Sequence, residues 1–206
     1  MDSDTYLTVK AFSQSLYKEK GSRFIGLAYP VTTKEGIKGI LETIRKEHHS
    51  ARHQCFAWML GAARQTYRIN DDGEPSGTAG RPILGEINSF GLTDILIVVV
   101  RYFGGRLLGT AGLINAYRSA AESSIINNEI IRLYVYDCLE LIFPFSSLNN
   151  VMRMIKDENL IQSHHAYGLE CRLTISFRSS AKEKIIKGLS LINGLEYKQI
   201  NIIEIP

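Results

Sequence analysis

The chain has 206 residues, of which 45% are hydrophobic and 22% charged, with a formal net charge of +3. This composition excludes wholesale disorder, and the length suffices for one large domain or two small ones. The longest run of large aliphatic residues, Ile95 to Val100, is far below the roughly 20 residues that a membrane span needs. The charge is evenly spread, with +2 over residues 1–130 and +1 over the rest. Neither half is therefore a strong electrostatic anchor for nucleic acid.

The N-terminal sequence and the number of cysteines both favour a cytoplasmic location. The first ten residues, MDSDTYLTVK, contain no basic start followed by an apolar stretch, so we expect no secretory signal. The three cysteines, Cys55, Cys138 and Cys171, are odd in number and have no paired spacing. This pattern excludes a disulfide framework and a structural zinc site, and favours a reducing compartment. We expect no membrane partner.

Periodicity predicts the elements of the first half in chain order. A helix carries an apolar stripe at Ile37, Ile40, Leu41 and Ile44, and its start is a capping box of Thr32 and Glu35. A second helix begins at Thr78, and a third runs from about residue 110 to residue 127. The run ILIVVV lacks alternation and predicts a central strand covered on both faces. The expected strands are residues 6–12, 23–31, 54–62, 64–70 and 94–102.

The chain after residue 128 has the element order β-α-β-β-α-β, which is the ferredoxin-like motif. Strands are expected over residues 134–143, 160–166, 170–177 and 195–205, with helices from Ser147 and from a capping box of Ser180 and Glu183. In residues 170–177 the alternation places Cys171, Leu173, Ile175 and Phe177 inside and Arg172, Thr174 and Ser176 outside.

Glycine is concentrated in one part of the chain. Nine of the 17 glycines lie between Asp71 and Gly112, which predicts loops with special backbone conformations. Two such loops lead into predicted helices, whose free N–H groups can hold an anion, and Arg81, Arg101 and Arg106 can add contacts. The spacing matches neither a P-loop nor a dinucleotide-binding fingerprint, so no cofactor is expected. The alternative interpretation is that these glycines only permit tight turns and close packing.

Two other groups of polar side chains are candidates for binding or catalysis. Asp71, Asp72 and Glu74 can bind a cation or supply a general base, but lack calcium-loop spacing, and the alternative is a solvated turn. His53 and Cys55 share a strand face, yet a nucleophilic pair needs a third, orienting group, so no catalytic residue and no metal site is assigned.

The aromatic pair Tyr102 and Phe103 ends the predicted central strand. Aromatic side chains beside a Gly-rich turn can stack on bases or grip a peptide. They can equally close the edge of the core, because sequence does not show exposure.

Three blocks of residues occur in a specific order and spacing. They are His53-x-Cys55-x-Ala57, then the block from Asp72 to Gly80 (DGEPSGTAG), then Arg101-Tyr102-Phe103-Gly104-Gly105 followed by Leu108-Gly109 and Gly112-Leu113. Together they resemble the signature of the IMPACT family, in the form of its bacterial YigZ-like branch. The match covers roughly residues 6 to 127, and the remainder agrees with the family's two-domain plan by element order.

The resemblance implies a two-domain α+β fold. Residues 1–130 would form an IMPACT N-terminal-like α/β sandwich similar to domain IV of elongation factor G. Residues 131–206 would form a ferredoxin-like domain similar to domain V of that factor. Eukaryotic members regulate translation by binding an activator of a starvation-responsive kinase through an additional N-terminal domain, and that partner is not carried over to this chain.

These observations favour a non-catalytic binding protein linked to translation or its stress regulation. It would bind RNA, the ribosome or a translation-associated protein through the Gly-rich loops. The alternatives are an enzyme for a small anionic substrate in the Gly-rich cleft, and an adaptor with an apolar patch around Tyr102, Phe103 and Leu108. The candidate binding residues are His53, Asp71, Asp72, Gly73, Glu74, Pro75, Thr78, Ala79, Gly80, Arg81, Arg101, Tyr102, Phe103, Gly104, Gly105, Arg106, Gly109 and Gly112.

Overall fold

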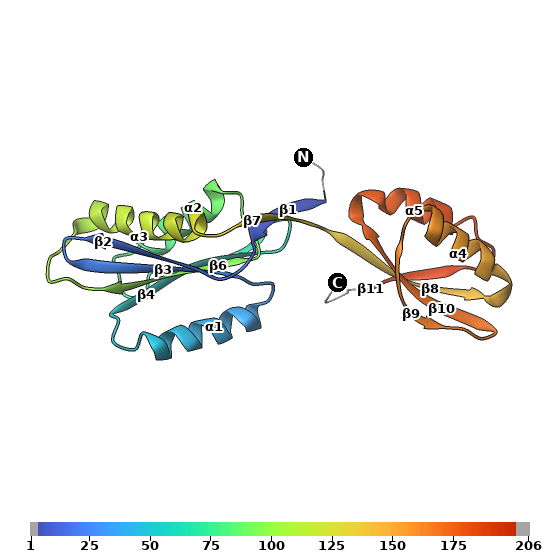
Figure 1. Ribbon diagram of the computed structural model, residues 1–206, viewed down its shortest axis with the longest axis horizontal. Coiled ribbons are helices and arrows are strands. Elements are labelled where there is room, and N and C mark those ends of the chain that lie inside the picture. The colour runs from blue at the N-terminus through green and yellow to red at the C-terminus, as the bar shows by residue number, and fades with distance from the viewer. Residues whose placement is uncertain (1–3, 201–206) are drawn as a thin grey trace. The chain divides into compact units, whose positions relative to one another are not determined.

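The chain folds into two compact units (Figure 1). The computed structural model describes residues 4–200. The N-terminal unit is Tyr6–Leu133. The C-terminal unit contains residues 134–200 together with Asp4 and Thr5, so the two ends of the described chain meet in one unit. This separates Asp4 and Thr5 from the expected N-terminal domain of residues 1–130.

The N-terminal unit is built on a five-stranded antiparallel sheet in the order β2-β3-β6-β4-β5. Its central strand β6 is the ILIVVV run, and the residues from Ile95 to Arg101 are all buried. The prediction of a strand covered on both faces is therefore confirmed. The strands are β2 (Ser13–Glu19), β3 (Ser22–Pro30), β4 (His53–Leu60), β5 (Thr66–Asn70) and β6 (Ile95–Tyr102).

Helices cover both faces of this sheet, as Figure 1 shows. Helix α1 (Lys34–Glu47) lies on one face, and α2 (Gly80–Ser89) and α3 (Gly109–Ile126) lie on the other. Alternate residues of β6 supply the two cores: Ile97 and Val99 pack in the core with α2 and α3, whereas Leu96 and Val98 pack in the core with α1. Because α2 and α3 lie on the same face of the sheet, the loops that lead into these two helices lie on that face as well.

Several local expectations for the N-terminal unit need correction. Thr33, one residue after the predicted Thr32, caps α1 by accepting from the Gly36 N–H. Strand β2 was not expected, and the strand predicted over residues 6–12 is shorter, because β1 spans Thr5–Val9. Strand β1 pairs instead with β7 (Ile130–Tyr134), a second unexpected strand.

The C-terminal unit has the predicted β-α-β-β-α-β order. Its sheet order is β11-β8-β10-β9, with all pairs antiparallel, which is the ferredoxin-like arrangement. The core lies between the sheet and the two helices. The elements are β8 (Tyr136–Pro144), α4 (Leu148–Asp157), β9 (Ile161–Ala166), β10 (Glu170–Arg178), α5 (Lys182–Leu189) and β11 (Glu196–Ile200), with 3₁₀ turns at Phe145–Ser147 and Ser179–Ala181.

Three expectations for this unit change. Thr174 and Ser176 of β10 are buried rather than exposed, because β10 is an inner strand and its neighbours cover these small side chains. Ser180 and Glu183 make no capping box: the Ser180 N–H donates to the Asp4 carboxylate, and α5 has no side-chain cap. Of the strand expected over residues 195–205, the part beyond Ile200 lies outside the described residues.

Candidate functional site

The loop that precedes α2 is organised by the carboxylate of Asp71. Its Oδ1 accepts from the N–H groups of Ala79 at 3.1 Å and Gly80 at 2.8 Å, and its Oδ2 accepts from Gly77 at 2.9 Å. Asp71 therefore occupies the N-terminal end of α2. The expectation that this helix start is free to hold an external anion is wrong, because an internal carboxylate already satisfies it. Thr78 does not cap α2, since its hydroxyl donates to the Pro75 carbonyl.

The second carboxylate of the loop, Asp72, ties the loop to β4. Its Oδ2 accepts from the Gln54 N–H at 2.7 Å, and its carbonyl accepts from His53 Nδ1 at 2.9 Å. Because a carbonyl can only accept, His53 carries a proton on Nδ1 and presents Nε2 toward Glu74. Neither aspartate is a free ligand, and among residues 4–200 no group of three or more His, Cys, Asp or Glu side chains is placed to hold a metal ion.

Glu74 is the buried acid of the site. Its Oε1 accepts from Arg101 Nη1 at 2.6 Å and from the Tyr117 hydroxyl at 2.8 Å, and His53 Nε2 lies 3.9 Å away. The side chains of Glu74 and Arg101 are only 3% and 6% exposed. Sequence analysis gave Tyr117 no role, although a buried tyrosine hydroxyl requires a partner.

Cys55 is part of the same hydrogen-bonded cluster but is not a nucleophile. Its thiol donates to the Asp71 carbonyl and lies 3.3 Å from the Tyr117 hydroxyl. Burial raises the pKa of the Cys55 thiol far above its ordinary value, and burial likewise raises the pKa of Tyr117. His53 points to Asp72 instead of Cys55. A protonated thiol with no base beside it is a structural group.

The aromatic pair at the end of β6 is split between the two faces of the sheet. The Tyr102 hydroxyl contacts His48 Nδ1 at 2.9 Å, and the guanidinium of Arg23 lies over its ring. Phe103 lies on the other side, beside Arg101, and is 42% exposed. The two rings therefore do not form one stacking surface, and Phe103 alone remains available.

Gly104 has a structural reason to be glycine. A Cβ there would collide with the backbone of the Gly21–Ser22 turn, and its N–H donates to the Ser22 hydroxyl. Gly109 has a φ of 70°, in the left-handed region that favours glycine, at the point where α3 begins. The interpretation that these glycines permit tight packing thus holds for Gly104, whereas Gly109 shapes the start of a helix.

Residues from both Gly-rich loops line one pocket of about 380 Å³, which we name the α3 pocket. Arg52 and His53 come from the start of β4, residues 73–75 from the first loop, and residues 107–110 from the second. Arg101, Phe103 and Leu113 complete it. The pocket thus gathers seven of the eighteen candidates. Outside its lining are Asp71, Asp72, Thr78, Ala79, Gly80, Arg81, Tyr102, Gly104, Gly105, Arg106 and Gly112.

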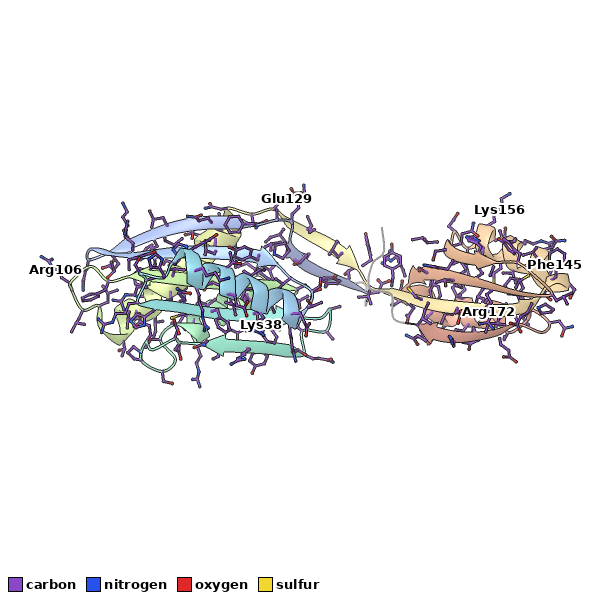
Figure 2. The ribbon with its side chains drawn as sticks, turned by 90° about the horizontal axis from the view of Figure 1, so that it is seen from below. Lys38, Arg106, Glu129, Phe145, Lys156 and Arg172 are labelled. Atoms are coloured by element: carbon purple, nitrogen blue, oxygen red, sulfur yellow. The ribbon has the colours of Figure 1, made fainter. Side chains whose placement is uncertain are left out.

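The α3 pocket combines the start of a helix with arginine side chains, of which Arg101 is paired with Glu74. Helix α3 has 18 residues and begins there without a side-chain cap or an acidic residue in its first turn, so its first N–H groups face the pocket without a capping side chain. Arg101 lines the pocket, and its buried Nε has no hydrogen-bond partner among the described residues. Arg52 is exposed at the wall, and Figure 2 shows Arg106 at the tip of the second loop.

The sequence and structure comparisons agree with this two-unit fold and its Gly-rich loops. The family model described as the Impact N-terminal domain matches residues 20–125. This stretch contains β3 to β6, α1 and α2 and nearly all of α3, including every residue of the α3 pocket. The chain therefore belongs to the IMPACT family.

Particular relatives extend the match beyond this domain. The IMPACT family member YigZ of Escherichia coli is 44% identical over 108 residues, which are 52% of this chain and 53% of that protein. The IMPACT family member YvyE of Bacillus subtilis is 30% identical over 168 residues, 81% of this chain and 77% of that protein. A crystal structure of a hypothetical protein matches with a TM-score of 0.72 and 29% identity, covering 96% of this chain and 98% of the other.

Two further observations bear on partners. Within the described part of the chain, no helix is long and apolar enough to cross a membrane. The exposed side chains at the mouth of the α3 pocket include Phe103 and Leu107, which is 87% exposed. Leu108, which was expected in an exposed apolar patch, is buried, and Tyr102 is half-buried on the other face.

Proposed function

We propose that the chain is a non-catalytic binding protein linked to translation or its stress regulation, and that it binds single-stranded RNA through the α3 pocket. The observation that carries this proposal is the uncapped start of α3 opening into a pocket that contains Arg101 and is flanked by Arg52. A phosphate bound there would accept hydrogen bonds from the N–H groups of the first turn and would lie at the positive end of the helix dipole. Membership of the IMPACT family supports the link to translation.

The residues around the pocket suit RNA in two further respects. Phe103 is an exposed ring at the pocket wall, and a base can stack on such a ring without regard to its identity. Arg52 and Arg106 are exposed and form no ion pair among residues 4–200, so both guanidinium groups can contact neighbouring phosphates. The small net charge of +3 predicts moderate affinity that depends on these few contacts.

The test is the binding of a fluorescently labelled uridine 12-mer, followed by anisotropy over a series of salt concentrations. Arg52→Ala and Arg106→Ala should each weaken binding and reduce the slope of log K against log salt by about 0.7, the value for one phosphate contact on a single strand. Arg68→Ala, an exposed arginine on the opposite sheet face, is the matched control and should change neither quantity. Arg101→Ala is unsuitable, because it leaves Glu74 buried and unpaired.

A second pair of variants separates the helix start from general electrostatics. Thr110 is exposed in the first turn of α3 and lines the pocket. Thr110→Glu places a carboxylate where the phosphate would sit, and because an acid in the first turn also favours the helix, the fold should be retained. Thr110→Gln keeps the size without the charge. Loss of RNA binding in Thr110→Glu but not in Thr110→Gln supports the proposal, and equal binding by both variants contradicts it.

One observation favours a different function for the same pocket. His53 presents Nε2 toward the pocket, 3.9 Å from Glu74 Oε1 and oriented by the Asp72 carbonyl, which is the arrangement of an acid–base group. An enzyme acting on a small phosphorylated or carboxylated substrate would use it. In that case, anionic metabolites should raise the thermal midpoint in a ligand screen, and His53→Gln should abolish turnover while it leaves ligand binding intact.

A further inference from the structure

A second concavity lies on the opposite face of the sheet from the α3 pocket. It is a groove of about 390 Å³ between α1 and the edge strand β5, and we name it the α1–β5 groove. Phe56 and Trp58 of β4 form its floor and are only 5% and 6% exposed. Helix α1 supplies one wall, and Arg68 and Asn70 of β5 supply the other.

The groove exists because α1 does not cover the whole sheet. The core beneath α1 takes its strand residues from β3, β6 and β4. The only β5 residue assigned to a core is Ile69, which packs with α2 and α3. The β5 side chains on the α1 face, including Arg68 opposite Trp58, are therefore left beside an open trough. Strand β5 is also an edge of the sheet, with no strand on its outer side among the described residues.

The rim of the groove carries unpaired positive charge. Lys34, Lys38 and Arg45 follow one another at spacings of four and seven along α1, and Arg68 faces them from β5. All four are exposed, and none has an ion pair or hydrogen bond from its side chain within residues 4–200. The only acid that lines the groove is Glu42. Lys38 on α1 is labelled in Figure 2.

The shape favours an extended peptide over a nucleic acid. The rings of Phe56 and Trp58 are too deeply buried to offer faces for stacked bases, but they give an apolar floor on which one hydrophobic side chain can rest. From Lys34 to Arg45 the helix rises about 16 Å, and about five residues of extended chain have the same length. Strand β5 itself has five residues.

We propose that the α1–β5 groove binds an acidic, extended segment of a partner protein. The segment would lie along the groove between α1 and β5, place one apolar side chain over Phe56 and Trp58, and direct acidic side chains to Lys38, Arg45 and Arg68. The apolar floor accommodates one hydrophobic side chain, and the charged rim supplies specificity for acidic residues on either side of it. This inference is independent of RNA binding, because the two sites lie on opposite faces of the sheet.

The test uses Trp58, the only tryptophan in the chain, as a reporter on the groove floor. The full chain is used to select from a displayed library of random 12-residue peptides. The enriched peptides are then synthesised and titrated while the tryptophan fluorescence is followed. We expect enrichment of peptides in which Asp and Glu flank an apolar residue, a shift of the Trp58 emission on binding, and weaker binding as salt rises.

Charge variants decide whether the rim is responsible. Arg45→Glu and Arg68→Glu should each weaken binding of the selected peptide by about tenfold or more, and Glu42→Lys should strengthen it. Lys46→Glu is the matched control, since Lys46 is exposed on α1 but does not line the groove. Proper folding of each variant is checked by circular dichroism.

Two outcomes would overturn the proposal. One is a selection that yields no acidic peptide able to shift the Trp58 emission. The other is peptide binding that Arg45→Glu and Arg68→Glu leave unchanged. If a uridine oligonucleotide shifts the emission and these two variants abolish that shift, the groove binds nucleic acid and the peptide assignment is wrong. Failure of RNA binding at the α3 pocket would leave all of these readouts unaffected.

Discussion

The buried ion pair between Glu74 and Arg101 allows a quantitative test of how the N-terminal unit is held together. Glu74→Gln keeps the size of the side chain and an oxygen that can accept from Tyr117, but it removes the negative charge. Arg101 then remains 94% buried with no counter-charge. Breaking one half of a buried pair costs about 3–5 kcal/mol, because the remaining charge stays desolvated.

Urea unfolding followed by Trp58 fluorescence measures this effect directly, since Trp58 lies in the same unit. With a slope of about 2 kcal/mol/M, a loss of about 3 kcal/mol lowers the midpoint by about 1.5 M. The double variant Glu74→Gln/Arg101→Met removes both charges. It should be more stable than Glu74→Gln alone, because an apolar replacement of a buried pair is often neutral or stabilising.

The double-mutant cycle provides the refutation. Charge coupling requires that the effects of Glu74→Gln and Arg101→Met sum to more than the effect of the double variant, by at least about 1 kcal/mol. If the two single effects simply add, or if Glu74→Gln costs less than about 1 kcal/mol, charge coupling between Glu74 and Arg101 does not stabilise the fold.

Two other predictions follow from close packing and from a perturbed carboxyl. A Cβ on Gly26 would collide with the Ala120 carbonyl of α3, so Gly26→Ala should lower the free energy of unfolding by about 1–3 kcal/mol, measured in urea. A Cβ on Gly39 would meet open space, so Gly39→Ala should raise the free energy of unfolding by about 0.5–1 kcal/mol. The hydrogen bond from the Arg178 guanidinium, with a smaller contribution from Ser180, holds the pKa of Asp4 well below its ordinary value of 3.8. The ionised Asp4 carboxylate therefore stabilises the folded state above pH 3.8, and this stabilisation is lost as the pH falls through the folded-state pKa. Calorimetry should show Asp4→Asn to be less stable at neutral pH, with a difference that shrinks below about pH 4. A difference that is independent of pH would contradict the ion-pair argument.

The parts of the fold that sequence predicted are those in which hydrophobic pattern and burial coincide. The ILIVVV run has no polar position, and only a strand between two helical layers can bury it completely. Strand β2 was missed for the opposite reason. Its inward-facing Ser13 and Ser15 are polar, yet both are buried because they donate to the Ser124 and Ala120 carbonyls of α3. A periodicity argument treats such serines as exposed.

The candidate site shows a similar division. The sequence analysis grouped His53 and the two Gly-rich loops as one candidate binding site, and Glu74, Arg101 and Phe103 line one pocket. The use of Asp71 as a cap for α2 could not be foreseen, because its bonds to Ala79 and Gly80 depend on a loop that folds back over eight and nine residues. Local capping rules consider only the N-cap residue and its close neighbours in the sequence.

The discontinuous C-terminal unit has a consequence for the order in which the chain is synthesised. Asp4 is translated before Arg178 and Ser180, which bind its carboxylate and lie more than 170 residues later in the chain. Tyr6–Leu133 can complete its own core in the interval. The contacts of Asp4 in the ferredoxin-like unit can form only after Arg178 and Ser180 have been translated. A fragment that starts at residue 134 would therefore contain the whole four-stranded sheet and still lack the carboxylate that fixes the turn before α5.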